Sequence, residues 1–175
     1  MKNSFIQKII TSEFVKFGDF TLKSGKKSNI YFDLRNIISE PQLVTELAYL
    51  LKEKVKPSVQ RICGVPYGAI PIATALSLET NIPMILKRKE VKEYGGKKMI
   101  EGVFQKGDKV LLIEDVITSG QSLLETIKEL EAVGLEIEQI LVVLDREEGG
   151  SEILKKGGYH IESITTKEEL LSFQK

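Results

Sequence analysis

The sequence is poor in several features that mark other classes of protein. Cys63 is the one cysteine, so no disulfide can form within the chain, and the apolar residues around it predict a buried, unreactive thiol. The one histidine, His160, lies outside every motif and is interpreted as a structural residue. No run approaches the roughly 20 apolar residues of a membrane helix, and the first residues do not resemble a signal peptide. These absences predict a cytoplasmic protein without a membrane segment.

The chain also lacks net charge, because its 25 Lys and Arg residues balance 25 Asp and Glu residues. A neutral chain has no general attraction to nucleic acid or to an anionic membrane, so neither is expected as a partner. Its 175 residues, 42% hydrophobic and 29% charged, fit a soluble domain with a substantial core. No internal repeat or linker divides the sequence, so we expect a single domain over residues 1–175.

Apolar spacing alternates between the periods of helix and strand. Residues 110–113 are apolar on both faces, which is typical of a central parallel strand covered by helices on each side. Alternating strands and helices predict an α/β fold with a parallel sheet, and the extended segment 17–38 predicts a small separate layer. We expect helices over 4–16, from Pro41 onward, over 69–79 and over 123–133; strands over 62–65, 84–86 and 140–144; and helix, strand and helix within 151–173.

The most informative segment begins where the 110–113 strand ends. Glu114 and Asp115 come first, followed by a hydroxyl-rich loop with Gly120 that opens a helix. Ligands of open α/β sheets bind beyond the carboxyl ends of the strands, and free N–H groups at a helix start favour phosphate. Paired carboxylates there suit sugar hydroxyls or the water shell of Mg²⁺. Taken alone, the loop has a plainer interpretation, in which Thr118 or Ser119 caps a helix and the acidic pair ends a strand.

The whole arrangement over 110–122 resembles the phosphoribosyl pyrophosphate (PRPP) signature of type I phosphoribosyltransferases. Four further segments resemble the orotate phosphoribosyltransferases, and they occur in the order of that family: residues 20–33, 64–71, 88–96 and 144–147. The resemblance looks closest to the first domain of UMP synthases, although no decarboxylase domain is expected after Lys175. It implies a central, mostly parallel sheet flanked by helices, a small N-terminal hood over about residues 1–38, and a mobile catalytic loop over 87–98.

The resemblance implies transfer of the phosphoribosyl group of PRPP to N1 of orotate, giving orotidine 5′-monophosphate and pyrophosphate in pyrimidine biosynthesis. It implies Mg²⁺ as cofactor, held by PRPP and water near Glu114 and Asp115 without a direct protein ligand. It also implies a homodimer in which the catalytic loop acts in trans. One alternative is a purine phosphoribosyltransferase, which segments 20–33 and 92–95 disfavour. Another is a non-catalytic regulator that senses PRPP and binds nucleic acid, which the zero net charge disfavours.

The site residues implied by the family pattern fall into three sets. The catalytic set is Lys92, Glu114 and Asp115. The PRPP-binding set is Lys23, Tyr67, Gly68, Arg88, Lys89, Lys92, Tyr94, Glu114, Asp115, Val116, Ile117, Thr118, Ser119, Gly120, Gln121 and Ser122. The orotate-binding set is Lys23, Tyr31, Phe32, Thr118 and Arg146.

Some of these assignments compete with plainer interpretations. The cations of the 87–98 loop could be a solvated surface run. Arg146 could pair with Asp145 or Glu147 on the surface, although its guanidinium would also match the carboxylate of orotate. Two positions depart from the pattern of many relatives, which have Lys at Gly68 and His at Tyr94. A proton role for that histidine therefore does not carry over to this chain.

Overall fold

The computed structural model describes residues 1–21, 27–88 and 99–173. The site residues Lys23, Lys89, Lys92 and Tyr94 lie outside this description. Helices of the described chain are α1 (Lys2–Thr11), the 3₁₀ helix η1 (Leu34–Ser39), α2 (Pro41–Lys52), α3 (Ala69–Thr80), α4 (Gln121–Ala132), α5 (Gly150–Lys156) and α6 (Lys167–Ser172). Its strands are β1 (Val15–Thr21), β2 (Lys27–Phe32), β3 (Arg61–Gly64), β4 (Met84–Lys87), β5 (Ile100–Glu101), β6 (Lys109–Ile117), β7 (Glu136–Asp145) and β8 (Ile161–Thr166).

The larger sheet has the strand order β5-β4-β3-β6-β7-β8. Every neighbouring pair is parallel except β4 and β5, which are antiparallel. Strand β6 lies in the interior of this sheet, and Val110 to Ile113 are completely buried. The predicted α/β fold with a central, mostly parallel sheet is therefore confirmed.

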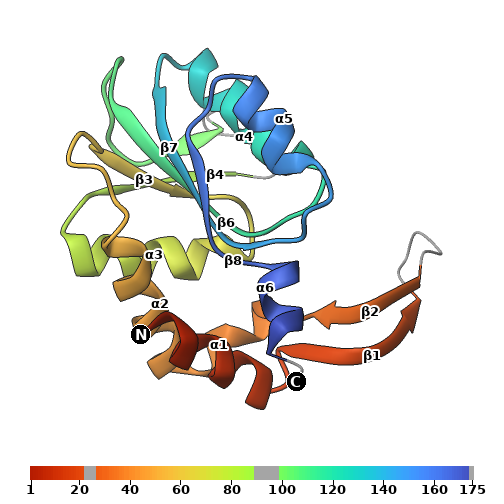
Figure 1. The fold of residues 1–175 in the computed structure, drawn as a ribbon. Coiled ribbons are helices and arrows are strands. Elements are labelled where there is room, and N and C mark those ends of the chain that lie inside the picture. The colour runs from red at the N-terminus through yellow and green to blue at the C-terminus, as the bar shows by residue number, and fades with distance from the viewer. Residues whose placement is uncertain (22–26, 89–98, 174–175) are drawn as a thin grey trace.

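Helices cover both faces of this sheet, with α4 and α5 on one side and α2 and α3 on the other (Figure 1). Successive strand residues point to opposite faces, so β6 contributes to two hydrophobic clusters. Leu111 and Ile113 pack in the cluster that contains the buried residues of α1, α2 and α3. Val110 and Leu112 pack in the cluster that contains those of α4. The double burial explains why this segment has no polar face in the sequence.

The N-terminal part forms a separate layer, in which β1 and β2 pair antiparallel in their own sheet. This hairpin extends away from the main sheet, and α6 lies beside its base (Figure 1). The expected helix over 4–16 is too long, because the chain leaves α1 at Thr11 and Glu13 adopts a positive φ of 57° before β1 begins. The expected extended conformation is also wrong from Leu34 onward, where η1 forms and buries Leu34 and Ile37.

Some strands extend beyond their expected ends, because their pairing continues past the apolar residues. Strand β6 runs through the acidic pair to Ile117, because its ladder with β7 continues to the Ile117–Asp145 pair. The short edge strand β5 was not predicted from the sequence. His160 lies directly before β8 rather than within a strand, and its Nε2 atom is 2.9 Å from Glu162 Oε1. Cys63 is buried as predicted, and burial raises the pKa of its thiol to about 11. None of the described helices has the length and apolar character needed to cross a membrane.

Candidate active site

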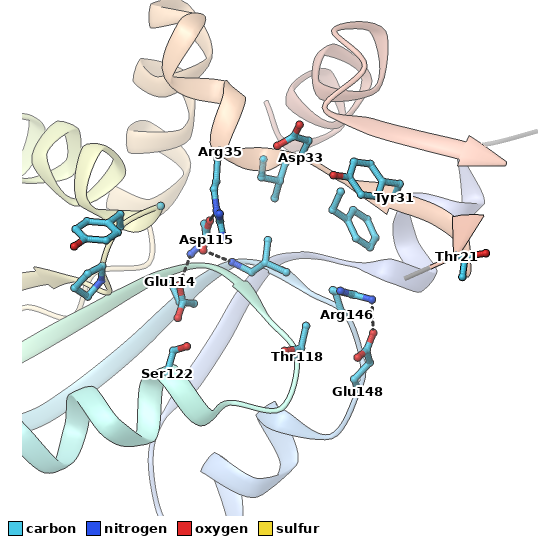
Figure 2. Close-up of a pocket in the computed structure, with 16 residues that line it drawn as sticks. Thr21, Tyr31, Asp33, Arg35, Glu114, Asp115, Thr118, Ser122, Arg146 and Glu148 are labelled. Atoms are coloured by element: carbon cyan, nitrogen blue, oxygen red, sulfur yellow. Dashed lines mark hydrogen bonds and ion pairs between the residues drawn. The ribbon is translucent and has the colours of Figure 1, made fainter. Parts of the chain in front are cut away.

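A cavity of about 680 Å³ opens at the carboxyl ends of β3, β6 and β7, beneath the N-terminal hood. Figure 2 shows side chains converging on it from four parts of the chain. The hood contributes Thr21 and residues 31–35, and the turn between β3 and α3 contributes residues 66–68. The remaining lining residues come from the end of β6 and the start of α4, and from the turn between β7 and α5: Glu114, Asp115, Val116, Thr118, Ser122, Arg146 and Glu148.

Glu114 is the more deeply buried member of the acidic pair near the end of β6. Glu114 is only 6% exposed, and burial, reinforced by a hydrogen bond and the charge of Asp115, raises the pKa of its carboxyl to about 9. The Asp115 N–H donates to Glu114 Oε1 at 3.2 Å, and Asp115 Oδ1 accepts from the Val116 N–H at 2.9 Å. The raised pKa favours the protonated form of the Glu114 carboxyl at neutral pH.

Gly68 lies directly against this pair. A Cβ atom at residue 68 would overlap the carboxylate of Asp115, although the φ of −60° at Gly68 is open to any residue. The restriction is therefore one of space and not of backbone conformation. It gives a physical reason for the departure found in the sequence, since a lysine at residue 68 fits only if Asp115 moves.

The loop after β6 encloses a small hollow of about 40 Å³, lined by Glu114 and residues 116–123. Gly120 precedes α4 with a φ of 78°, and no side-chain hydrogen bond caps this helix. The plainer interpretation, in which Thr118 or Ser119 caps α4, is therefore wrong. The first N–H groups of a helix have no partner within it, and together with the helix dipole they favour an anion.

Gly150, the first residue of α5, packs directly against this loop. Its N–H donates to the Thr118 carbonyl at 2.9 Å. A Cβ atom at residue 150 would overlap that carbonyl oxygen and lie 2.7 Å from the Gly120 nitrogen. The shape of the hollow thus depends on a glycine about thirty residues away in the sequence.

Arg146 lies across the cavity, immediately after β7. Its Nη2 atom is 2.7 Å from Glu148 Oε1, and its guanidinium carbon lies 5.7 Å from the centre of the Phe32 ring. The buried Nε of Arg146 has no hydrogen-bond partner in the described part of the chain. The expected alternative of pairing with Asp145 or Glu147 is wrong, because Glu148 is the partner and Asp145 accepts from Ser151 Oγ at 2.5 Å. A guanidinium that lines the cavity beside an aromatic ring suits a planar anion.

The structure brings many of the predicted site residues together. In the cavity or the adjoining hollow lie Tyr31, Phe32, Tyr67, Gly68, Glu114, Asp115, Val116, Ile117, Thr118, Ser119, Gly120, Gln121, Ser122 and Arg146. Arg88 is not among these lining residues, and its Nη1 atom is 3.0 Å from Glu101 Oε1 beside β5. The positions predicted from 22–26 and 89–98 fall outside the described chain.

Sequence reasoning missed four polar residues that line the cavity: Thr21, Asp33, Arg35 and Glu148. Asp33 and Arg35 flank the buried Leu34, directly after the aromatic pair at 31–32. The available signal in the sequence was a leucine between two charged residues. The expectation of an extended segment over 17–38 did not assign these charged residues to the site. Glu148 lies two residues after Arg146, but nothing local in the sequence shows that the two side chains pair.

An acidic pair near the end of a central strand, followed by a hydroxyl-rich loop beneath a hood, is the arrangement that the comparisons with known proteins assign to a class. The family model of the phosphoribosyl transferase domain matches residues 34–170. The orotate phosphoribosyltransferase of Pyrococcus horikoshii is 46% identical over 97% of this chain and 93% of its own length. The uridine 5′-monophosphate synthase of Bos taurus is 43% identical over 89% of this chain, which corresponds to 33% of that enzyme.

Among solved structures, an orotate phosphoribosyltransferase of Mycobacterium tuberculosis H37Rv in complex with PRPP superposes with a TM-score of 0.79. It is 25% identical to this chain, and the superposition covers 97% of this chain and 98% of that one. The chain belongs to the orotate phosphoribosyltransferase family. The resemblance recognised in the sequence is therefore confirmed.

Proposed function

We propose that this chain transfers the phosphoribosyl group of PRPP to N1 of orotate, which forms orotidine 5′-monophosphate and releases pyrophosphate for pyrimidine biosynthesis. The observation that carries the proposal is Arg146, which lines the cavity and whose guanidinium lies beside the Phe32 ring. Orotate is planar and carries a carboxylate, and a purine base carries none. The curated relatives at 46% and 43% identity bear the names of orotate phosphoribosyltransferase and UMP synthase, which also disfavours a purine substrate or a regulator.

The PRPP molecule would lie along the carboxyl edge of the sheet. Loop residues 118–122 and the first turn of α4 bind the 5′-phosphate through N–H and hydroxyl groups. The carboxylate of Asp115 accepts from a ribose hydroxyl, and the protonated carboxyl of Glu114 can donate to the other. The solved relative in complex with PRPP supports the choice of ligand.

Mg²⁺ is the cofactor that we infer for this site. The described lining holds four carboxyl groups (Asp33, Glu114, Asp115 and Glu148) and two guanidinium groups, which cannot neutralise a highly anionic substrate. No group of three or more potential ligand side chains occurs in the described parts of the chain, and a metal held by PRPP and water needs none. The acidic pair suits that water shell. When bound, the metal would neutralise charge on the pyrophosphate.

Orotate would lie against Tyr31 and Phe32 with its carboxylate toward Arg146. N1 of orotate attacks C1′ as the bond to pyrophosphate breaks, with inversion and an oxocarbenium-like transition state. Little covalent work falls on the protein, so its contribution is to orient the reactants and to stabilise the charge on the leaving group. Lys92 is the residue proposed for that stabilisation, on the strength of the family resemblance.

We further propose a cytoplasmic homodimer in which loop 87–98 of one subunit acts in the active site of the other. Mixing the inactive variants Lys92→Ala and Asp115→Ala tests the loop, once tagged subunits show exchange. A loop in trans restores roughly a quarter of the sites, because about half of the dimers are mixed and each has one intact site. A loop in cis restores none.

Orotate absorbance in the ultraviolet tests the proposed reaction directly. The absorbance should fall when PRPP and Mg²⁺ are added to the protein and orotate, and orotidine 5′-monophosphate should accumulate. Adenine or hypoxanthine in place of orotate is the matched control and should not be consumed. Unchanged orotate in the complete mixture would reject the proposed activity, and consumption of a purine would reassign it.

A further inference from the structure

Arg35 reaches into the cavity from the hood and has no role in the function described so far. The buried residues Leu34 and Ile37 fix η1 against the core, while the side chain of Arg35 is 83% exposed. Its Nε atom lies 4.0 Å from Asp115 Oδ2, and Figure 2 shows the guanidinium pointing down onto the acidic pair. A well-anchored backbone thus presents a solvated cation to the cavity beside Asp115.

The described lining of the cavity contains few cations beside its carboxyl groups. Arg35 and Arg146 are the two cations among its described lining residues. Arg146 is held at 2.7 Å by Glu148 and lies over Phe32, at the end assigned to orotate. Arg35 lies at the other end, beside Asp115 and the turn that contains Gly68. In the described lining, Arg35 is therefore the cation positioned for PRPP.

The turn between β3 and α3 carries no cation at residue 68, which is a glycine packed against Asp115 in its observed position. Any side chain there would overlap the carboxylate of Asp115. A cation from another segment would therefore complement Lys92 and Mg²⁺ on this side of the cavity. Arg35, which approaches the same carboxylate from above, occupies that place.

We propose that Arg35 is a PRPP-binding residue that takes a pyrophosphate oxygen as its partner. The proposal rests on the proposed function. Arg35 makes a long, exposed contact with Asp115, which stabilises little and is easily exchanged. A charge-assisted bond to phosphate is much stronger, because its donor and acceptor are both ionised. The exchange also releases Asp115 for the ribose hydroxyls.

Titration of Arg35→Ala with Mg²⁺-PRPP by calorimetry tests the proposal. We expect the dissociation constant to rise about ten- to a hundredfold, as for one lost charge-assisted bond. Mg²⁺-pyrophosphate should weaken to a similar extent, whereas ribose 5-phosphate should bind as before, because Arg35 lies away from the 118–122 loop. Arg35→Lys should recover part of the affinity. Lys16→Ala, which removes an exposed hood cation outside the cavity lining, is the matched control and should bind normally.

The kinetics give a second, independent readout. Arg35→Ala should raise the KM for PRPP at least tenfold and leave the KM for orotate within about threefold. An unchanged affinity for Mg²⁺-PRPP, or an equal rise in both KM values, would overturn the proposal. Thermal unfolding of Arg35→Ala and Arg35→Gln checks that the exposed position tolerates substitution. The calorimetry uses no orotate, so a wild-type chain that binds PRPP but does not consume orotate rejects the proposed function without rejecting the role of Arg35.

Discussion

Replacing Glu114 by Gln should make the ligand-free protein more stable, and increasingly so as the pH rises. The carboxyl of Glu114 is buried at the end of β6, and its pKa rises from an ordinary value of 4.5 to about 9. Between these two values the folded chain keeps a proton that the unfolded chain loses. Glutamine has nearly the same shape and cannot ionise, so the variant does not lose this stability as the pH rises.

The sign follows from the proton count. Stability changes with pH in proportion to the protons bound by the unfolded state minus those bound by the folded state. For Glu114 this difference is negative between pH 4.5 and about 9, so its contribution to stability is lost as the pH rises. Each pH unit costs about 1.4 kcal/mol, and the interval from pH 5 to 7.5 therefore costs on the order of 3 kcal/mol.

Denaturant unfolding at pH 5, 6, 7 and 7.5 measures this effect, with circular dichroism as the probe. Other groups also titrate, so the quantity to follow is the difference in unfolding free energy between Glu114→Gln and wild type. We expect that difference to grow by on the order of 3 kcal/mol over the range. Glu152→Gln, which removes an exposed carboxyl on α5, is the control and should give a nearly constant difference. Parallel pH curves for wild type and Glu114→Gln would refute the reasoning.

Four further predictions concern catalysis. Asp115→Asn should reduce kcat severely and leave the circular dichroism spectrum unchanged; near-normal turnover would remove the acidic pair from the mechanism. Excess chelator should abolish turnover and Mg²⁺ should restore it, and activity that survives the chelator contradicts the metal requirement. Arg146→Ala should raise the KM for orotate on the order of 100-fold and the KM for PRPP far less, whereas equal effects would place Arg146 elsewhere. Gly150→Ala should raise the KM for PRPP because its methyl group displaces the Thr118 carbonyl, and an unchanged KM would show that the loop accommodates it.

The main sheet was predictable because its signals are local. Residues 110–113 are apolar on both faces, and that pattern alone indicates a strand between two helical layers. The continuation of β6 to Ile117 was not predictable in this way, because it depends on pairing with β7. The same holds for β5, a two-residue strand that exists through its antiparallel pairing with β4. At residue 34 the apolar spacing of η1 was too short to distinguish a 3₁₀ helix from an extended segment.

The loop over 114–122 was predictable as a candidate anion site because its acids, hydroxyls and glycine are contiguous. The contacts that complete the cavity depend on the folded chain, whether their partners are distant or near in the sequence. Arg35 approaches Asp115 across about eighty residues, and the pairing of Arg146 with Glu148 depends on the conformation of the turn after β7. Local spacing carries no information about such contacts, so these partners required the folded structure.

Two glycines show most clearly how the site constrains the sequence. A side chain at residue 68 would displace the carboxylate of Asp115, and one at residue 150 would displace the backbone of the loop at Thr118 and Gly120. In both cases the sequence shows only a glycine. The sequence alone does not tell whether that glycine is there for lack of space or because a turn is flexible. The space at Gly68 links two features of the site: while Asp115 occupies its observed position, a cation cannot be added at residue 68. A chain with this placement of Asp115 must take positive charge from elsewhere, and the hood supplies it at Arg35.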